Sequence, residues 1–239
     1  MEKVIGALWA PEGTSRAEYA ERLRAELPGA LKAAGASGIR LNVRDATVEP
    51  AAPLQQQWQA PQQDAVVQFW LPSANAIFRA PIDAVLAAHS SRFELWLTAE
   101  STIIANTQHP PQPGQRTEGW SQASFISFLP GQSWMDSVKH WHSHHARVAI
   151  DTQSNFEYVQ NIVVRPLTEN APAYAAFVEE CFPLDAMTDP HVFFDAVGDE
   201  PKYSRNTEDM LKSCQGFIDF TTIDVIPTSQ FDYAHLDRS

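Results

Sequence analysis

The sequence predicts an α+β fold in which two successive units repeat the element order β-α-β-β-α-β. The chain has 239 residues, a length that suits two domains of about 110–120 residues each. Hydrophobic residues make up 44% of it, with seven Trp and thirteen Phe, which is enough for a sizeable core and argues against disorder. Strand and helix periodicities then recur in the same order on either side of a polar, proline-rich segment, residues 106–118.

The first half contains four predicted strands and two predicted helices. Apolar runs or strict alternation mark the strands, and Tyr19, Leu23, Leu27 and Leu31 fall at helical spacing. Thr14 or Ser15 is the expected N-cap of that first helix. In chain order the predicted elements are a strand at 4–9, a helix at 19–31, strands at 39–48 and 64–71, a helix at 81–89 and a strand at 92–104, with a loop rich in Pro and Gln at 50–63. This is the ferredoxin-like order.

The second half restarts the same order after the segment 106–118, whose prolines and glycine predict a linker. We therefore divide the chain into a first unit (residues 1–105), this linker and a second unit (residues 119–239). At 173–182 the repeat requires a strand, whereas the alanines and glutamates there favour a helix. The other predicted elements are a strand at 123–129, a helix at 134–150, a strand at 155–165, helical pieces at 185–197 and 207–214, and a strand at 216–226.

Charge and composition exclude several classes of partner. The formal net charge of −12 argues against nucleic acid and against anionic membranes, because both need a basic surface. No apolar run approaches the ~18 residues of a membrane-spanning helix, and the N-terminus lacks the pattern of a signal peptide. Cys181 and Cys214 lie in separate predicted elements without a CxxC motif, which indicates free thiols in a reducing compartment. We expect a cytoplasmic protein.

The most informative segment is the helix predicted at 134–150, which holds four of the chain's eight histidines. At about 100° per residue, one arc of this helix is mostly apolar and should face the sheet, whereas His140, Ser143 and His144 lie on the other side. His145 lies near the centre of the inward arc, where burial should lower its pKa and keep it neutral near pH 7. Such a group is suited to proton transfer. The inward arc comprises Trp134, Val138, Trp141, His142, His145 and Ala149.

A lone inward histidine is more often a satisfied core residue than a catalytic one. Two observations favour a functional role for His145. The strand at 155–165 offers Tyr158, Gln160 or Asn161 as a partner for the imidazole. The corresponding helix of the first unit contains no histidine, so packing alone does not require one. The sequence therefore predicts one pocket with side chains suited to proton transfer, and this pocket lies in the second unit.

Metal and haem are less favoured alternatives. His140 and His144 form an i,i+4 pair, and His142 and His145 form an i,i+3 pair, but no Glu completes an HExxH motif and Asp136 is the only carboxylate in this helix. There is no CxxCH motif for haem attachment, and no glycine-rich phosphate loop supports a flavin or nicotinamide. We expect no cofactor.

Two other sets of side chains receive structural interpretations. Trp9, Trp70 and Trp96 lie on predicted strands and are expected to pack in the core rather than to line a pocket. The adjacent Glu179 and Glu180 are expected on a solvated face.

The pattern Trp141…His145-Ala146, followed by Tyr158-Val159-Gln160-Asn161, resembles the EthD family, over about residues 131–165. His145 matches the family's helix histidine, and Tyr158 and Asn161 match its strand motif. The family belongs to the dimeric α+β barrel superfamily. The resemblance implies two ferredoxin-like units packed sheet to sheet, each with a pocket between sheet and helices. This chain departs from the family by being a tandem fusion whose first unit lacks the histidine, which puts activity there in doubt.

The resemblance also implies a class of function. Superfamily members include cofactor-free monooxygenases, muconolactone isomerase, polyketide cyclases and some haem enzymes. We expect a cofactor-independent lyase, dehydratase or isomerase that acts on a small hydrophobic, aromatic or polyketide-like metabolite, as in the catabolism of aromatic compounds. The alternatives are a non-catalytic binding or accessory protein for such a metabolite, and a cofactor-free monooxygenase. The fused pair either replaces the usual dimer as a monomer or forms a homodimer again.

Five side chains are the predicted site. His145 is the expected general acid/base, and Tyr158 is expected to donate to a developing oxyanion or to orient the imidazole. Trp141 is the expected apolar wall, and His142 and Asn161 are expected to bind polar groups of the substrate.

Overall fold

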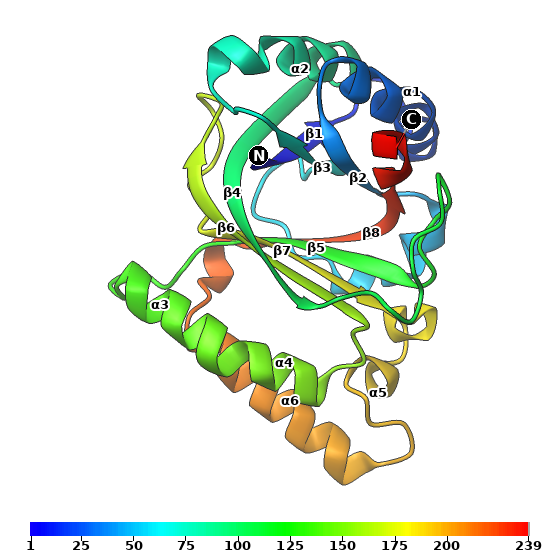
Figure 1. Ribbon diagram of the computed structural model, residues 1–239. Helices are drawn as coiled ribbons and strands as arrows, with labels where there is room; N and C mark the ends of the chain where they lie inside the picture. The colour runs from blue at the N-terminus through cyan, green and yellow to red at the C-terminus, as the bar shows by residue number, and fades with distance from the viewer. Residues whose placement is uncertain (239) are drawn as a thin grey trace.

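The computed structural model describes residues 1–238 as an eight-stranded antiparallel barrel with helices on two opposite sides (Figure 1). The strands follow one another around the closed barrel in the order β1-β3-β2-β8-β5-β7-β6-β4. Each half thus forms a four-stranded sheet, and the sheets join at the β2–β8 and β4–β6 seams. The strands are β1 (Glu2–Trp9), β2 (Ser37–Val43), β3 (Ala65–Leu71), β4 (Arg92–Ile104), β5 (Trp120–Ile126), β6 (Glu157–Pro166), β7 (Ala176–Phe182) and β8 (Asp224–Asp232).

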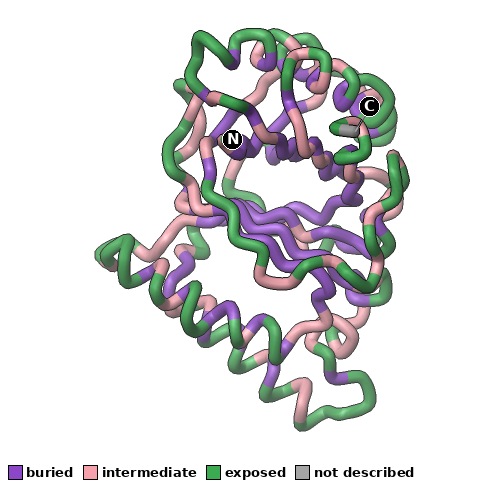
Figure 2. The backbone as a smooth tube through the Cα atoms, viewed as in Figure 1, coloured by how far each residue is buried: buried purple, intermediate pink, exposed green. Residues whose placement is uncertain are grey.

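The helices confirm the predicted α+β class and the repeated β-α-β-β-α-β order. In Figure 1, α1 and α2 cover the first sheet, and α3, α4 and α6 cover the second. Figure 2 shows buried strands between helices whose outer faces are exposed. Among residues 1–238 no helix has the length and apolar character needed to cross a bilayer. The helices are α1 (Arg16–Ala33), α2 (Ala76–His89), α3 (Trp134–His140), the π-helical turn η2 (Trp141–His145), α4 (Ala146–Thr152), α5 (Pro190–Phe193) and α6 (Glu200–Gln215), with 3₁₀ turns η1 (Ala46–Leu54), η3 (Leu184–Met187), η4 (Phe220–Thr222) and η5 (Ala234–Arg238).

Helix α1 shows how local sequence determines an element. Ser15 is its N-cap: the Ser15 hydroxyl accepts from the Glu18 amide, and the Glu18 carboxylate accepts from the Ser15 amide, which forms a capping box. The helix continues through Pro28. Its inner face, together with Phe69 and other side chains of the first sheet, forms an apolar cluster that fills the space between that sheet and its helices. The α1 residues in this cluster are Tyr19, Ala20, Leu23, Leu27 and Leu31.

Three segments illustrate how the structure departs from the sequence prediction. Residues 176–182, where composition favours a helix, form the central strand β7, which pairs with both β5 and β6. The strand predicted at 216–226 begins only at Asp224, because Asp219 caps the 3₁₀ turn η4 just before it. The strand predicted at 39–48 ends at Val43, because Asp45 caps η1 inside the expected region. In each case a cap or a pairing partner outweighs local pattern.

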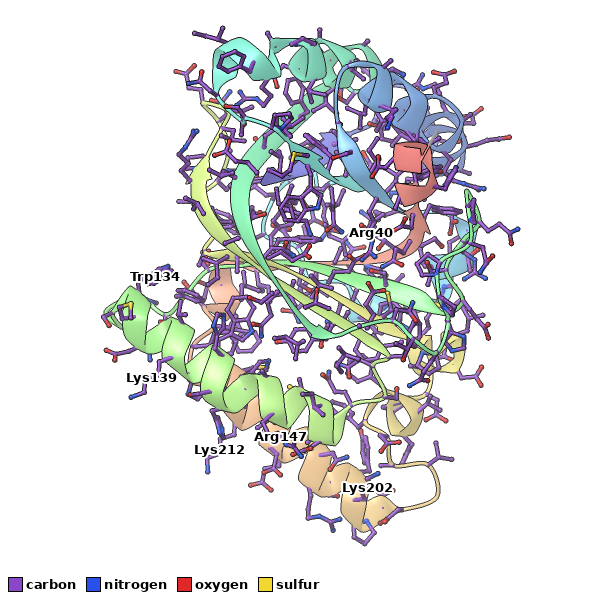
Figure 3. The ribbon with its side chains drawn as sticks, in the orientation of Figure 1. Arg40, Trp134, Lys139, Arg147, Lys202 and Lys212 are labelled. Carbon is purple, nitrogen blue, oxygen red and sulfur yellow. The ribbon has the colours of Figure 1, made fainter. Side chains whose placement is uncertain are left out.

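The barrel interior contains a buried polar cluster that joins the two halves. Arg40 on β2 contacts Glu157 at 2.7 Å, Glu179 at 3.0 Å and Asp232 at 3.4 Å, and Figure 3 shows it between the two sheets. The amides of Asn42, Gln68 and Gln230 also donate to Glu179, which is fully buried. The sequence predicts Glu179 on a solvated face. This expectation is wrong, because β7 is covered on both sides.

Candidate functional site

A cavity of about 690 Å³ lies between the second sheet and its helices. Side chains of β5, β6, β7 and β8 form its floor, and the helix of residues 134–152 together with α6 forms its roof. Its lining is mainly apolar. This lining includes Trp141, Phe193, Phe194, Met210, Phe217 and Ile223. The cavity has the size and character of a site for a small, largely apolar molecule.

The π-helical turn η2 places His145 in the wall of this cavity. Its Nδ1 lies 3.0 Å from the Ser213 hydroxyl on α6, and its ring packs against Phe217. Among the described residues, the structure records no hydrogen-bond partner for Nε2. Burial, and then the charges of His140 and His144, lower the pKa of His145 to about 4. The imidazole is therefore neutral near pH 7, as the sequence predicts, although its partner is Ser213 rather than a side chain of β6.

The other histidines of this helix occupy different positions from those predicted. His142 is exposed and does not line the cavity, and Trp134 is also exposed (Figure 3). His140 is half-buried, with Nε2 donating to the Ser213 carbonyl at 3.0 Å. The helical wheel places Trp141, His145 and Ala149 on the inner face correctly, but it misplaces His142 because a π turn holds more residues than an α turn. The buried residues of this helix are Ser137, Trp141, His145, Ala146, Ala149 and Thr152.

Tyr158 on β6 lines the same cavity with its hydroxyl held by two donors. Trp141 Nε1 donates to this oxygen at 2.9 Å and Gln160 Nε2 at 2.8 Å. The phenol proton has no acceptor among the described residues and is free for a ligand. Burial, and then the Glu180 charge, raise the pKa of Tyr158, which stays protonated. The structure thus brings together Trp141, His145 and Tyr158.

Asn161 lies on the opposite face of β6, because successive residues of a strand point to opposite sides. It is fully buried, and neither polar atom of its side chain has a partner in the part of the chain that the structure describes. It does not line the cavity. Asn161 and Tyr158 therefore share strand β6, but their side chains point to opposite faces of it, whereas the sequence predicts both at one site.

Glu180 on β7 is a cavity residue that sequence reasoning missed. It is 9% exposed and lies opposite Tyr158 in the β6–β7 register. Asn155 Nδ2 donates to Glu180 Oε1 at 2.9 Å, and no cation within residues 1–238 forms an ion pair with it. Burial raises the pKa of Glu180 to about 7. Once 176–182 is taken as a strand, alternation puts Glu180 on the face of Ala176 and Val178, which is the signal that could have identified it.

The first half of the chain contributes one wall of the cavity. Pro50, Pro53 and Leu54 of η1, and the two glutamines that follow, line it. The loop that follows η1 is bound to the second half by Asp224 at the start of β8. The Asp224 carboxylate accepts hydrogen bonds from the backbone amides of Trp58 and Gln59, at 2.9 and 3.1 Å. The cavity is therefore built by both halves.

Acid should destabilise the protein through His145. Its pKa is about 4 when folded and 6.5 ordinarily, so between these values the unfolded chain binds a proton that the folded one does not. Stability is then lost as pH falls from 6.5 to 4, by on the order of 3 kcal/mol. Urea unfolding at several pH values should show a smaller loss in His145→Gln than in the wild type. An exposed control far from this helix, His235→Gln, should keep the wild-type dependence; equal slopes in all three proteins would contradict the assignment.

Within residues 1–238, no three His, Cys, Asp or Glu side chains are grouped so that they could hold a metal ion.

Known proteins are similar to this chain in two respects: one domain of its second half, and the fold of the whole chain. Residues 129–220, which include His145 and Tyr158, match the EthD domain. A structure described as an anthrone oxidase-like protein superposes with a TM-score of 0.57 at 9% identity, over 97% of this chain and 93% of that one. A putative chlorite dismutase (TM-score 0.48, 12% identity, 99% and 97% covered) and a putative monooxygenase from Lactobacillus acidophilus NCFM (0.46, 13%, 97% and 96%) are also similar. No curated protein matches the sequence.

The first of these likenesses shows the fold, and the domain match covers the helix and strand that carry the cavity's polar side chains. Residues 129–220 of this chain match the EthD domain, and they lie in a closed eight-stranded barrel that both halves of the chain build.

Proposed function

We propose that this protein binds a small, largely apolar metabolite in the cavity and catalyses a cofactor-independent elimination or isomerisation on it by proton transfer. One observation supports this above the others: a neutral imidazole and a phenol with an unused proton line the same apolar cavity. A water-poor site strengthens the hydrogen bonds that a developing charge would receive. Aromatic and polyketide-like carbonyl compounds fit this combination of an apolar wall and a few polar groups.

The roles of the side chains follow from their contacts. Ser213 fixes the His145 ring through Nδ1, which leaves Nε2 to accept or donate at a bound molecule. Trp141 and Gln160 hold the Tyr158 oxygen so that its proton is available to a carbonyl oxygen of the ligand. The Trp141 ring also forms part of the apolar wall.

A panel of aromatic ketones and polyketide-like β-hydroxy ketones tests this proposal, with mass spectrometry following loss of water and chromatography following isomers. We expect turnover by the wild type and a loss of about 100-fold or more in His145→Gln and Tyr158→Phe. The exposed His144→Gln is the control for a histidine change outside the cavity. Full activity in His145→Gln would contradict the proposed role of His145.

The same panel distinguishes the two other functions that the sequence left open. Binding of a panel member without any turnover would indicate a binding or accessory protein. Oxygen uptake in a closed electrode cell, with product heavier by oxygen, would indicate a cofactor-free monooxygenase.

A further inference from the structure

The cavity floor carries a carboxyl group and a phenol side by side. Tyr158 and Glu180 are directly opposite in the β6–β7 register, and both line the cavity. Side chains at such positions start from Cβ atoms about 4.5–5.5 Å apart. His145 lines the same cavity from the helix side. A molecule in the cavity can therefore meet all three groups.

Within residues 1–238, no cation forms an ion pair with Glu180. Asn155 is its close hydrogen-bond donor, and the Gln122 amide lies at 3.5 Å from Oε2. Tyr158 on β6 lies beside Glu180, and His145 on η2 and Cys214 on α6 line the cavity from the helix side. In the described part of the chain, no titratable side chain of η1, η3 or α5 lines the cavity. No ion pair thus holds the Glu180 carboxyl in one protonation state.

We propose that Glu180 is the catalytic residue that removes and returns the proton, and that the substrate is an apolar ketone with a removable hydrogen beside its carbonyl. This inference rests on the proposed function and deepens it. Tyr158 donates to the ketone oxygen, and Glu180 acts on the adjacent carbon. Neutral His145 forms a hydrogen bond with a second polar group of the substrate.

The proton transfer balances without any further reagent. A Glu180 carboxylate oxygen takes the hydrogen beside the carbonyl as a proton, and the C–H electron pair forms a C=C bond. The C=O π pair moves to oxygen, where the Tyr158 proton stabilises the enolate through a hydrogen bond. Where the substrate has a C=C bond one carbon further from the carbonyl, the enolate is a dienolate, and return of the proton to its far carbon gives the conjugated isomer. Where it has a β-hydroxyl group, the enolate re-forms C=O, its C=C electron pair moves to form the new C=C bond between the α and β carbons, and the C–O bond breaks as the hydroxyl takes the proton and leaves as water.

Acid–base matching distinguishes Glu180 from His145. Proton transfer at neutral pH is most efficient when the pKa of the group lies near the working pH. Burial raises the pKa of Glu180 to about 7 and lowers that of His145 to about 4, so the imidazole is the weaker base of the two.

Deuterium exchange into 1-tetralone, a bicyclic aromatic ketone, tests this inference in the full-length protein. Nuclear magnetic resonance follows the hydrogens beside the carbonyl in D₂O, and quenching of tryptophan fluorescence reports binding. We expect the wild type to accelerate exchange, with a rate that rises with pH and levels off above about pH 7. Glu180→Gln, which keeps the shape and the Asn155 contact, should lower the rate about 100-fold or more. Glu180→Asp should be slower than wild type but keep a pH transition.

The controls separate failure of this inference from failure of the proposed function. Glu208→Gln, the same chemical change at an exposed position of α6, should exchange like the wild type. Exchange that survives in Glu180→Gln but disappears in His145→Gln would overturn the role of Glu180 and leave the proposed function standing. Binding without exchange by the wild type, or no binding, would contradict the proposed function itself. Infrared difference spectra of wild type against Glu180→Gln should show one carboxyl titrating near neutral pH, and its absence would also overturn the inference.

Discussion

Replacing Arg40 with methionine should lower the free energy of unfolding by about 3–5 kcal/mol at pH 7, because it leaves buried carboxylates without their counter-charge. Arg40 is the cation that contacts Glu157 and Glu179 inside the barrel, and the Glu179 side chain is fully buried. Burial opposes ionisation of Glu179, yet Arg40 and the neighbouring amides lower its pKa to about 2. Urea denaturation followed by circular dichroism measures the loss.

The pH dependence follows from the same group. Glu179 has a pKa of about 2 in the folded protein and 4.5 ordinarily, so it adds stability above pH 4.5 that disappears as pH falls towards 2. Arg40→Met removes this contribution, and its unfolding free energy should change less over that acid range.

Two further variants test the explanation for Arg40. Adding Glu179→Gln to Arg40→Met removes one uncompensated charge and should restore part of the stability. Arg147→Met is the surface control: Arg147 points outward (Figure 3), and its ion pair with Asp151 is exposed, so the expected loss is only about 0.5 kcal/mol. Equal effects of Arg40→Met and Arg147→Met would show that the buried cluster does not stabilise the barrel.

Gly119→Ala should cost about 3 kcal/mol or more, because an added methyl group has no room beside β5. Gly119 has φ of +88°, and its Cβ would clash with the backbone carbonyl oxygen of Phe182 and lie 2.9 Å from the Phe156 ring. The carbonyl belongs to the end of central strand β7 and cannot move without disturbing the sheet. Overpacking typically costs about 1–3 kcal/mol, and the left-handed backbone adds about 1–2 kcal/mol for a residue with a side chain.

Gly131 offers a matched control for this prediction. Its φ is +84°, but a Cβ there would meet nothing within 4 Å. Gly131→Ala should therefore show the backbone cost alone, about 1–2 kcal/mol. The difference between the two variants, measured by urea unfolding, isolates the steric term. If both lose the same stability, the contact with Phe182 is not restrictive.

The sequence predicted an element well where the interactions that form it join residues that are close together in the chain. The strand at 92–104 has the predicted bounds, because strict alternation is readable from neighbouring residues. Ser15, one of the two N-cap candidates, caps α1 through a contact with a residue only three positions away. Segment 176–182 is different: it forms a strand because it pairs with β5 and β6, which lie outside the segment whose composition favours a helix.

The candidate site shows the same division. The pattern of Trp141, His145 and Tyr158 was visible in the sequence, and the structure places these side chains in one cavity. The wheel misplaced His142, because the π turn changes the helical phase. Glu180 was missed for a related reason: its inward position follows only from β7 being a strand.

The α+β class, the repeated element order and the EthD-like motif could all be predicted from the sequence, since periodicity, capping and motif spacing act over a few residues. Only the folded chain shows that Arg40 compensates carboxylates of the other half, and that η1 of the first half lines the cavity of the second. It also shows that Ser213 partners His145 and that Glu180 lies opposite Tyr158. These contacts join residues far apart in the chain, and their energies depend on burial, which no local pattern encodes.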